Sequence, residues 1–182
     1  MNNHSALLLP HHRPEELIGL RLAAAAVRKN QFLYLRYRIE GPLEELLIPE
    51  YKPLGIRKNN LWQNTCFEAF WAEANSTTYW ELNYSVNSDW NIYKFSNYRS
   101  NQVEEQYIPN FKPIHRQSKN SLSIGLTIEL PACIAADTNL EFSFTAVLEQ
   151  KNGNLSYWAL THNGVDPDFH RRDSFLLELS NQ

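Results

Sequence analysis

The chain has 182 residues, a formal net charge of −3 and a pI near 6.1. A chain of this length can bury the core of one domain, so we expect a single domain over residues 1–182. The small negative charge offers no strong attraction to a phosphate backbone, which argues against nucleic acid as a partner. Aromatic residues make up 13% of the chain and methionine occurs once, a composition that suits strands better than helices.

No segment of the sequence is typical of membrane insertion or secretion. The longest apolar run, residues 22–27, is too short to span a bilayer, and the first residues lack the pattern of a signal peptide. We therefore expect a cytoplasmic protein with no membrane partner, and the sequence leaves its oligomeric state open. Cys66 and Cys133 form no CxxC motif, which argues against a zinc site or a redox pair.

Short stretches of alternating apolar and polar residues, separated by clusters of Asn, Gly, Pro and Ser, predict an antiparallel β-sandwich of roughly ten strands. In chain order, the expected strands are residues 6–9, 18–28, 32–40, 46–48, 65–71, 79–86, 90–95, 122–130, 140–150, 155–162 and 174–179. Turn residues at 29–30 and 151–154 predict tight antiparallel hairpins.

The segment 15–29 also has the features of a helix, because an Ala-rich run follows Pro14 and two acidic residues. The alternation of Ile18, Leu20 and Leu22, and the turn that follows directly, favour a strand. A strand is therefore the prediction for this segment.

Two connecting segments have their own signals. Pro131 suits the first position of a helix, so we expect a short helical turn over residues 131–136. Residues 97–119 are polar and contain Pro109 and Pro113, which predicts a long loop of the kind that often carries function.

The strands expected at 65–71 and 79–86 bring two carboxylates together. Any antiparallel register that packs the aromatic faces of the strands together leaves Glu68 and Glu81 on one common face. Because like charges repel across neighbouring strands, such a pair needs a cation, a shared proton or a polar ligand. Arg99 is the candidate cation. The alternative is a solvent-facing pair, relieved by water and by neighbouring basic side chains.

Aromatic residues are dense in the same part of the sequence. Flat rings beside carboxylates and amides are typical of sugar recognition, but large aromatic residues in strands also fill sandwich cores. The residues concerned are Trp62, Trp90, Tyr93, Phe95 and Tyr98.

A second polar cluster follows the strand expected at 155–162. His162, Asp166, Asp168 and His170 have the side chains of metal ligands, but their spacing matches no metal signature. We therefore expect no metal, and these side chains can instead brace the loop through hydrogen bonds to its backbone.

Three separated stretches carry a resemblance to a known family. LWQNTCFEAFW, YWELNYSVNSDWNIYKFSNYR, and SYWALTH followed by PDFH resemble the bacterial DOMON-like domain proteins, and the likeness runs over nearly the whole chain. The resemblance implies a β-sandwich related to DOMON domains and to family-nine carbohydrate-binding modules, a wider group that binds sugars or haem. The chain has no GxGxxG fingerprint for a dinucleotide or flavin.

These observations favour a non-catalytic domain that binds a carbohydrate or another small polar ligand. The expected ligand-binding residues are Glu68, Glu81, Asn83, Trp90, Tyr93, Arg99, His162, Asp168 and His170. We expect no catalytic residue, no metal and no cofactor.

Three alternatives remain open from the sequence. Haem could bind as in some DOMON relatives, with axial ligands from His162, His170 or His115, because the single methionine and the absence of CxxCH leave only histidine ligation. The aromatic-rich face could instead dock a protein partner. A glycoside hydrolase, in which Glu68 and Glu81 divide the acid and base roles, is less favoured because paired carboxylates more often serve structure or binding.

Overall fold

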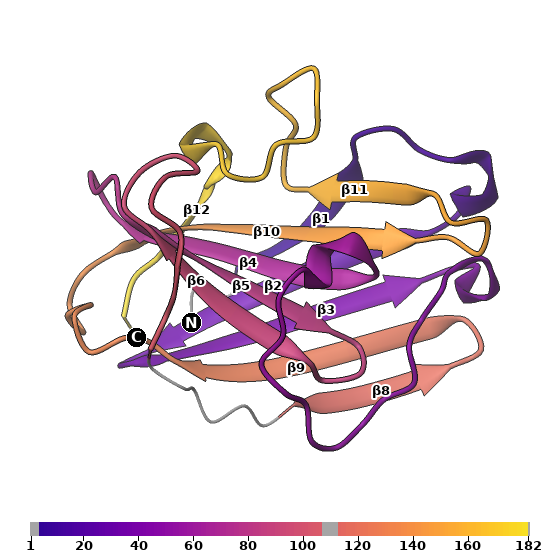
Figure 1. Ribbon diagram of the computed structural model, residues 1–182, viewed down its shortest axis with the longest axis horizontal. Helices are drawn as coiled ribbons and strands as arrows, with labels where there is room; N and C mark the ends of the chain where they lie inside the picture. Colours follow the sequence, from indigo (N-terminus) through magenta and orange to yellow (C-terminus); the bar gives the residue numbers. More distant parts are fainter. Residues whose placement is uncertain (1–3, 107–112, 182) are drawn as a thin grey trace.

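Two layers of antiparallel strands make up the protein, as Figure 1 shows for the computed structural model, which describes residues 4–106 and 113–181. The first layer runs in the order β1 (His4–Pro10), β2 (Arg21–Lys29), β3 (Phe32–Glu40), β9 (Ser121–Glu129) and β8 (Ile114–Ser118). The second layer runs in the order β7 (Val103–Glu104), β6 (Trp90–Phe95), β5 (Tyr79–Ser85), β4 (Cys66–Glu73), β10 (Leu140–Glu149) and β11 (Leu155–Ala159), and β12 (Leu177–Leu179) pairs with the start of β10. The predicted β-sandwich is therefore confirmed.

Strand β1 joins the two layers. Most of it pairs with β2, whereas Leu9 and Pro10 at its end pair with Ala159 and Trp158 of β11. Four short 3-10 helices lie in the connections, η1 (Glu15–Leu17), η2 (Leu43–Glu45), η3 (Leu61–Gln63) and η4 (Arg172–Ser174). No helix in the described part of the chain is long and apolar enough to cross a membrane.

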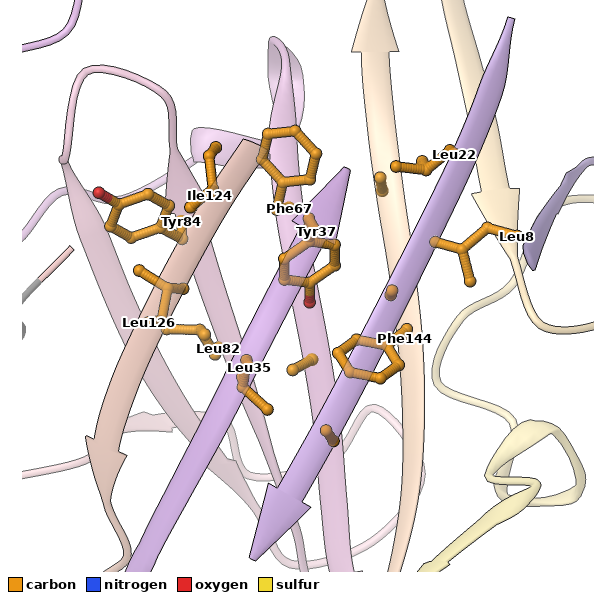
Figure 2. Packing of buried hydrophobic residues seen from close by; sticks show 14 of the residues in the cluster. Leu8, Leu22, Leu35, Tyr37, Phe67, Leu82, Tyr84, Ile124, Leu126 and Phe144 are labelled. Atoms are coloured by element: carbon orange, nitrogen blue, oxygen red, sulfur yellow. The ribbon is translucent and has the colours of Figure 1, made fainter. Parts of the chain in front are cut away.

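The main core lies between the layers and is built from alternate residues of each strand. In β3 every second side chain is buried, which matches the period of two expected for a strand with one solvent-exposed face. Figure 2 shows Leu35 and Tyr37 of β3 beside Phe67 of β4 and Phe144 of β10. The Tyr37 hydroxyl reaches across the sandwich and donates a hydrogen bond to the backbone carbonyl of Glu68 at 2.6 Å.

Strands β4 and β5 differ from β3 because nearly all their residues are buried on both faces. One face belongs to the main core, and the other, which we call the outer face of the second layer, carries a second apolar cluster. The long connection after β11 supplies Phe169 and Phe175 to that cluster. In Figure 1 this connection rises above β10 and β11 as an orange and yellow loop.

Several predicted strands are confirmed with their turns. The segments expected at 32–40 and 90–95 are strands with the predicted bounds, and both predicted hairpins are antiparallel. Asn30 and Gly153 adopt the positive φ that these tight turns require. Within the segment 15–29 the strand prediction is confirmed from Arg21 onward.

Other predicted bounds are wrong, each for a local reason. Residues 18–20 are not in a strand, because η1 and Gly19, with φ of +89°, turn the chain before Arg21. Residues 46–48 make only an isolated bridge, between Leu46 and Gln150. The strand expected at 155–162 ends at Ala159, and the one expected at 174–179 is shortened because its first residue closes η4.

The predicted loop at 97–119 is also wrong in part, because it contains β7 and β8. Strand β8 is an edge strand with mostly exposed polar residues, so it lacks the apolar alternation that identifies a half-buried strand. Pro109 lies outside the described residues.

The predicted helical turn at 131–136 is a pair of β-turns instead, closed by hydrogen bonds from the Ile134 amide to the Pro131 carbonyl at 2.9 Å and from the Thr138 amide to the Ala135 carbonyl at 3.2 Å. Arg28, only 1% exposed, donates from its guanidinium to the carbonyl oxygens of Ala135, at 2.7 Å, and Thr138. A side chain from β2 therefore ties these two turns to the first layer through their carbonyl oxygens.

Candidate functional site

The outer face of the second layer is hollowed by a cavity of about 410 Å³. Its floor comes from β4, β5, β6, β10 and β11, and its walls come from η3 and from the connections after β6 and β11. The lining residues are Trp62, Glu68, Phe70, Glu81, Tyr93, Phe95, Arg99, Gln102, Val147, Tyr157, Pro167, Phe169 and His170.

The strand register brings the two predicted carboxylates onto this floor. Glu68 of β4 lies opposite Asn83 of β5. Two residues further along β4, Phe70 lies opposite Glu81, so Glu81 is on the same face as Glu68. Glu68 is 2% exposed and Glu81 is 6% exposed. The prediction that they share one face is confirmed, while the alternative of a solvent-facing pair is not.

Glu68 has one fixed partner in the floor. The hydroxyl of Thr145, its neighbour in β10, donates to Oε2 of Glu68 at 2.8 Å. Among the described residues no donor contacts the other oxygen, Oε1. Burial and the negative charge of Glu81 together raise the pKa of Glu68 to about 8.

Glu81 is oriented by a buried amide. Asn83 donates from Nδ2 to Oε1 of Glu81 at 2.8 Å, and the thiol of Cys66 contacts Oδ1 of Asn83 at 3.5 Å. Burial raises the pKa of Glu81 to about 7, although the Asn83 hydrogen bond and the positive charge of Arg99 oppose the shift. The pair therefore keeps a proton near neutral pH, one of the three solutions expected from the sequence.

His170 lies beside Glu81, with Nε2 of the ring 3.9 Å from Oε2 of the carboxylate. The Tyr79 hydroxyl accepts the backbone amide of Arg99 at 3.1 Å and lies 2.8 Å from Nδ1 of His170. Tyr79 and His170 are thus joined by one hydrogen bond, and the other ring nitrogen, Nε2, faces Glu81. Burial lowers the pKa of His170 to about 4, so the ring is neutral at physiological pH.

Arg99, the predicted cation, forms its ion pair elsewhere. Its guanidinium donates to Oδ1 of Asp168 at 2.9 Å, and the Tyr98 hydroxyl donates to Oδ2 of the same carboxylate at 2.6 Å. These hydrogen bonds lower the pKa of Asp168 in spite of its partial burial. Arg99 acts on Glu68 and Glu81 only through its charge, which lowers the pKa of both.

Aromatic rings surround the carboxylates. Phe70, Tyr93 and Phe95 are buried in the floor, and Phe95 stacks on Tyr79 with ring centroids 4.8 Å apart. Trp62, in η3, is 46% exposed and forms part of the rim. The cavity thus combines flat apolar walls with a polar floor.

The predicted ligand-binding residues fall into three groups: those that line the cavity, those that hold lining side chains in place, and those that lie away from it. Glu68, Glu81, Tyr93, Arg99 and His170 line the cavity. Asn83 and Asp168 do not line it but hold Glu81 and Arg99 in place.

Trp90 and His162 lie away from the cavity. Trp90 faces the core between the layers, because alternation in β6 puts it opposite the face that carries Tyr93, and the guanidinium of Arg57 lies 4.7 Å from its ring. His162 contacts the backbone carbonyl of Leu9 through Nε2 at 2.8 Å, so its ring is used to brace the end of β1.

Eight lining residues are outside the set predicted to bind ligand. They are Trp62, Phe70, Phe95, Gln102, Val147, Tyr157, Pro167 and Phe169. Val147 could have been found, because alternation in β10 places it on the same face as Thr145. Pro167 and Phe169 belong to a connection without periodicity, and no local pattern indicates where it packs.

Groups that could bind a metal or haem are dispersed. The described residues contain no cluster of three or more His, Cys, Asp or Glu side chains arranged around a metal position. Of the three histidines considered for haem, only His170 lines the cavity. His115 belongs to β8 in the first layer, where its ring stacks on Tyr51 with centroids 4.6 Å apart.

The sequence matches no protein-family model, and a search of curated proteins gave no match either. Solved structures do resemble the fold. A candidate carbohydrate-binding protein from Bacteroides uniformis ATCC 8492 superposes with a TM-score of 0.69 at 10% identity, over 98% of this chain and 86% of that one.

A family 9 carbohydrate-binding module from Caldicellulosiruptor kristjanssonii, in complex with cellotriose, gives a TM-score of 0.60 at 13% identity, over 100% of this chain and 83% of the module. The same kind of module from that organism, in complex with glucose, gives a TM-score of 0.59 at 13% identity, over 100% of this chain and 85% of the module. At these identities the likeness establishes a shared fold, the β-sandwich of the family 9 modules.

Proposed function

We propose that this chain is a non-catalytic carbohydrate-binding domain, related to DOMON-like proteins and family 9 modules, that holds its ligand in the cavity on the outer face of the second layer. The observation that carries the proposal is the combination of aromatic walls with a buried polar floor. A sugar ring presents flat C–H surfaces and directed hydroxyl groups, and it needs both kinds of contact. The volume, about 410 Å³, falls within the range of about 300–1,000 Å³ usual for small-molecule sites.

The residues divide their roles according to position. Glu68, Glu81, Arg99 and His170 would hydrogen-bond the ligand, and Tyr93 and Trp62 would contact its apolar faces. Asn83 and Asp168 act as positioning residues, because each holds a cavity side chain through a hydrogen bond of 2.8 or 2.9 Å. This assignment needs no cofactor.

The placement of the carboxylates supports binding rather than hydrolysis. Glycosidases place their acid and their second carboxylate on either side of the scissile bond. Glu68 and Glu81 rise from adjacent strands on one face of one sheet, so they would approach a ligand from the same side. The modules of similar fold, in complex with glucose and cellotriose, add support from outside the chain.

Isothermal titration calorimetry with a panel of mono- and oligosaccharides tests this function. Trp62→Ala should weaken binding by about tenfold or more, which corresponds to about 1.4 kcal/mol. Tyr34→Ala is the matched control, because Tyr34 is an equally exposed aromatic residue on the first layer, outside the cavity. Absence of binding to every sugar would overturn the proposal.

Chromogenic glycosides test the non-catalytic part. We expect no turnover above the uncatalysed rate. Turnover that disappears in both Glu68→Gln and Glu81→Gln would show that the domain is an enzyme.

A further inference from the structure

The charges around the cavity do not balance. Its floor holds two carboxylates that are almost completely buried, and Arg99 is the only Lys or Arg among the described residues that line it. Burying a carboxylate is costly unless the charge is paired or neutralised. A cation close to the pair would remove this cost.

The two nearest positive candidates do not supply that cation. Arg99 is 51% exposed at the rim and is already paired with Asp168. His170 is neutral, because burial and the positive charge of Arg99 lower its pKa to about 4. The floor therefore relies on retained protons when no ligand is bound.

One carboxyl oxygen, Oε1 of Glu68, is evidence for a ligand. Glu68 is 2% exposed and lines the cavity, yet in the described part of the chain only Thr145 donates to its carboxyl group, through Oε2. Buried polar atoms are almost always hydrogen-bonded, so an acceptor left open beside a cavity is a place for a donor from the ligand. Within residues 4–106 and 113–181, Oε2 of Glu81 has only the longer contact of 3.9 Å to Nε2 of His170.

The walls favour a cation as well. Phe70, Tyr93 and Phe95 lie on the same face as the glutamates. The rest of the aromatic lining comes from Trp62, Tyr157 and Phe169. The face of an aromatic ring attracts a positive charge, and the attraction grows when the cation is desolvated. Aromatic rings around buried carboxylates form a site for an ammonium group.

We propose that the cavity selects a sugar with a free, protonated amino group, whose ammonium donates to Glu68 Oε1 and to Glu81. This inference rests on the proposed function and narrows it from carbohydrates in general to amino sugars. The ammonium would take over the role of the retained proton, so that both carboxylates ionise in the complex.

Glucosamine, glucose and N-acetylglucosamine form a matched set of probes, because they differ mainly in one substituent. Titration calorimetry at mildly acidic pH, where the amine stays protonated, should give a dissociation constant for glucosamine at least about tenfold lower than for either neutral sugar. Titrations in buffers of different ionisation enthalpy should show proton release with glucosamine and none with glucose, because the ammonium lowers the pKa of Glu68 and Glu81.

Glu68→Gln should reduce the ratio between glucose and glucosamine dissociation constants to near one, whereas Glu44→Gln, which removes an exposed carboxyl group outside the cavity, should leave the ratio unchanged. The proton release of the wild-type protein keeps the test decisive if Glu68→Gln does not fold. Glucose binding as tight as glucosamine binding would overturn the amino-sugar inference while the proposed function stands. Absence of binding to all three sugars and to the wider panel would overturn both.

Discussion

The free energy of unfolding should fall as the pH rises from about 6.5 to 8. Folding raises the pKa of Glu81 to about 7 and that of Glu68 to about 8, from the ordinary value of 4.5. A carboxyl group whose pKa is raised by folding stabilises the folded state at low pH, and this stability is lost as the pH rises toward the folded pKa. The decline should therefore end near pH 8.

The size of the effect follows from the number of protons. Each proton that the folded chain retains and the unfolded chain has lost changes the free energy of unfolding by about 1.4 kcal/mol per pH unit. Near pH 6.5 the folded pair retains close to two protons, which gives a decline of about 3 kcal/mol per unit. Once the pair has lost its first proton, near pH 7, the decline eases to about half of that value.

His170 and Asp168 act in the opposite direction at lower pH. Burial lowers the pKa of His170 from 6.5 to about 4, so its contribution is present above pH 6.5 and is lost as the pH falls toward 4. Together with His115 and His162, whose pKa values burial also lowers, it opposes the carboxyl contribution between about pH 4.5 and 6.5, so the decline is shallower there than at pH 6.5 to 7. The pKa of Asp168 is lowered from 3.8, so its effect falls below this range.

Urea unfolding followed by tryptophan fluorescence, repeated across this pH range, measures the decline. The double variant Glu68→Gln and Glu81→Gln should lose it, whereas Glu44→Gln should keep it, because Glu44 is exposed. A wild-type free energy of unfolding that stays level or rises from pH 6.5 to 8 would refute the reasoning, since it would mean that the carboxyls ionise as readily in the folded chain as in the unfolded one.

Three substitutions outside the cavity test contacts between distant elements, each by urea denaturation against the wild-type protein. Tyr37→Phe removes the hydrogen bond to the Glu68 carbonyl and should lower the free energy of unfolding by about 1 kcal/mol. An unchanged urea midpoint would show that water replaces the hydrogen bond. Arg28→Lys should cost about 2–4 kcal/mol, because a single ammonium cannot reach both loop carbonyls, and full stability would contradict that role. Gly55→Ala should cost about 2 kcal/mol or more, because its Cβ would lie 1.7 Å from the Ser88 carbonyl oxygen, and a neutral result would mean that the two loops separate readily.

The strands could be predicted because alternation is a local property of the sequence. The pattern that places Glu68 and Phe70 on one face of β4 is contained in a few consecutive residues, and it fixes the face whatever the partner strand is. The common face of Glu68 and Glu81 followed from two such patterns and one short connection. Strand β8 was not predicted, because an exposed edge strand has no alternation of apolar and polar residues.

The partners of side chains in connections could not be predicted in the same way. Arg99 pairs with Asp168, 69 residues further along the chain, and nothing in the local sequence selects Asp168 over Glu68 or Glu81. The choice depends on how the connection after β11 packs on the outer face, where Phe169 and Phe175 bury apolar surface. Once these rings are in place, Asp168 is held at the rim and takes up the Arg99 charge.

This arrangement explains why the floor of the cavity stays acidic. Other buried polar side chains find their partners within the protein: Arg28 donates to the loop carbonyls, and the hydroxyl of Thr65 donates to the Leu47 carbonyl at 2.7 Å. An amide at position 68 or 81 could accept a hydrogen bond from Thr145 or Asn83 without the cost of a buried acid. Unlike an amide, a carboxyl group at these positions can ionise when a positive group enters the cavity, a capacity that the folded chain alone does not need. The same property that reduces stability above pH 6.5 would then strengthen the binding of a cationic ligand.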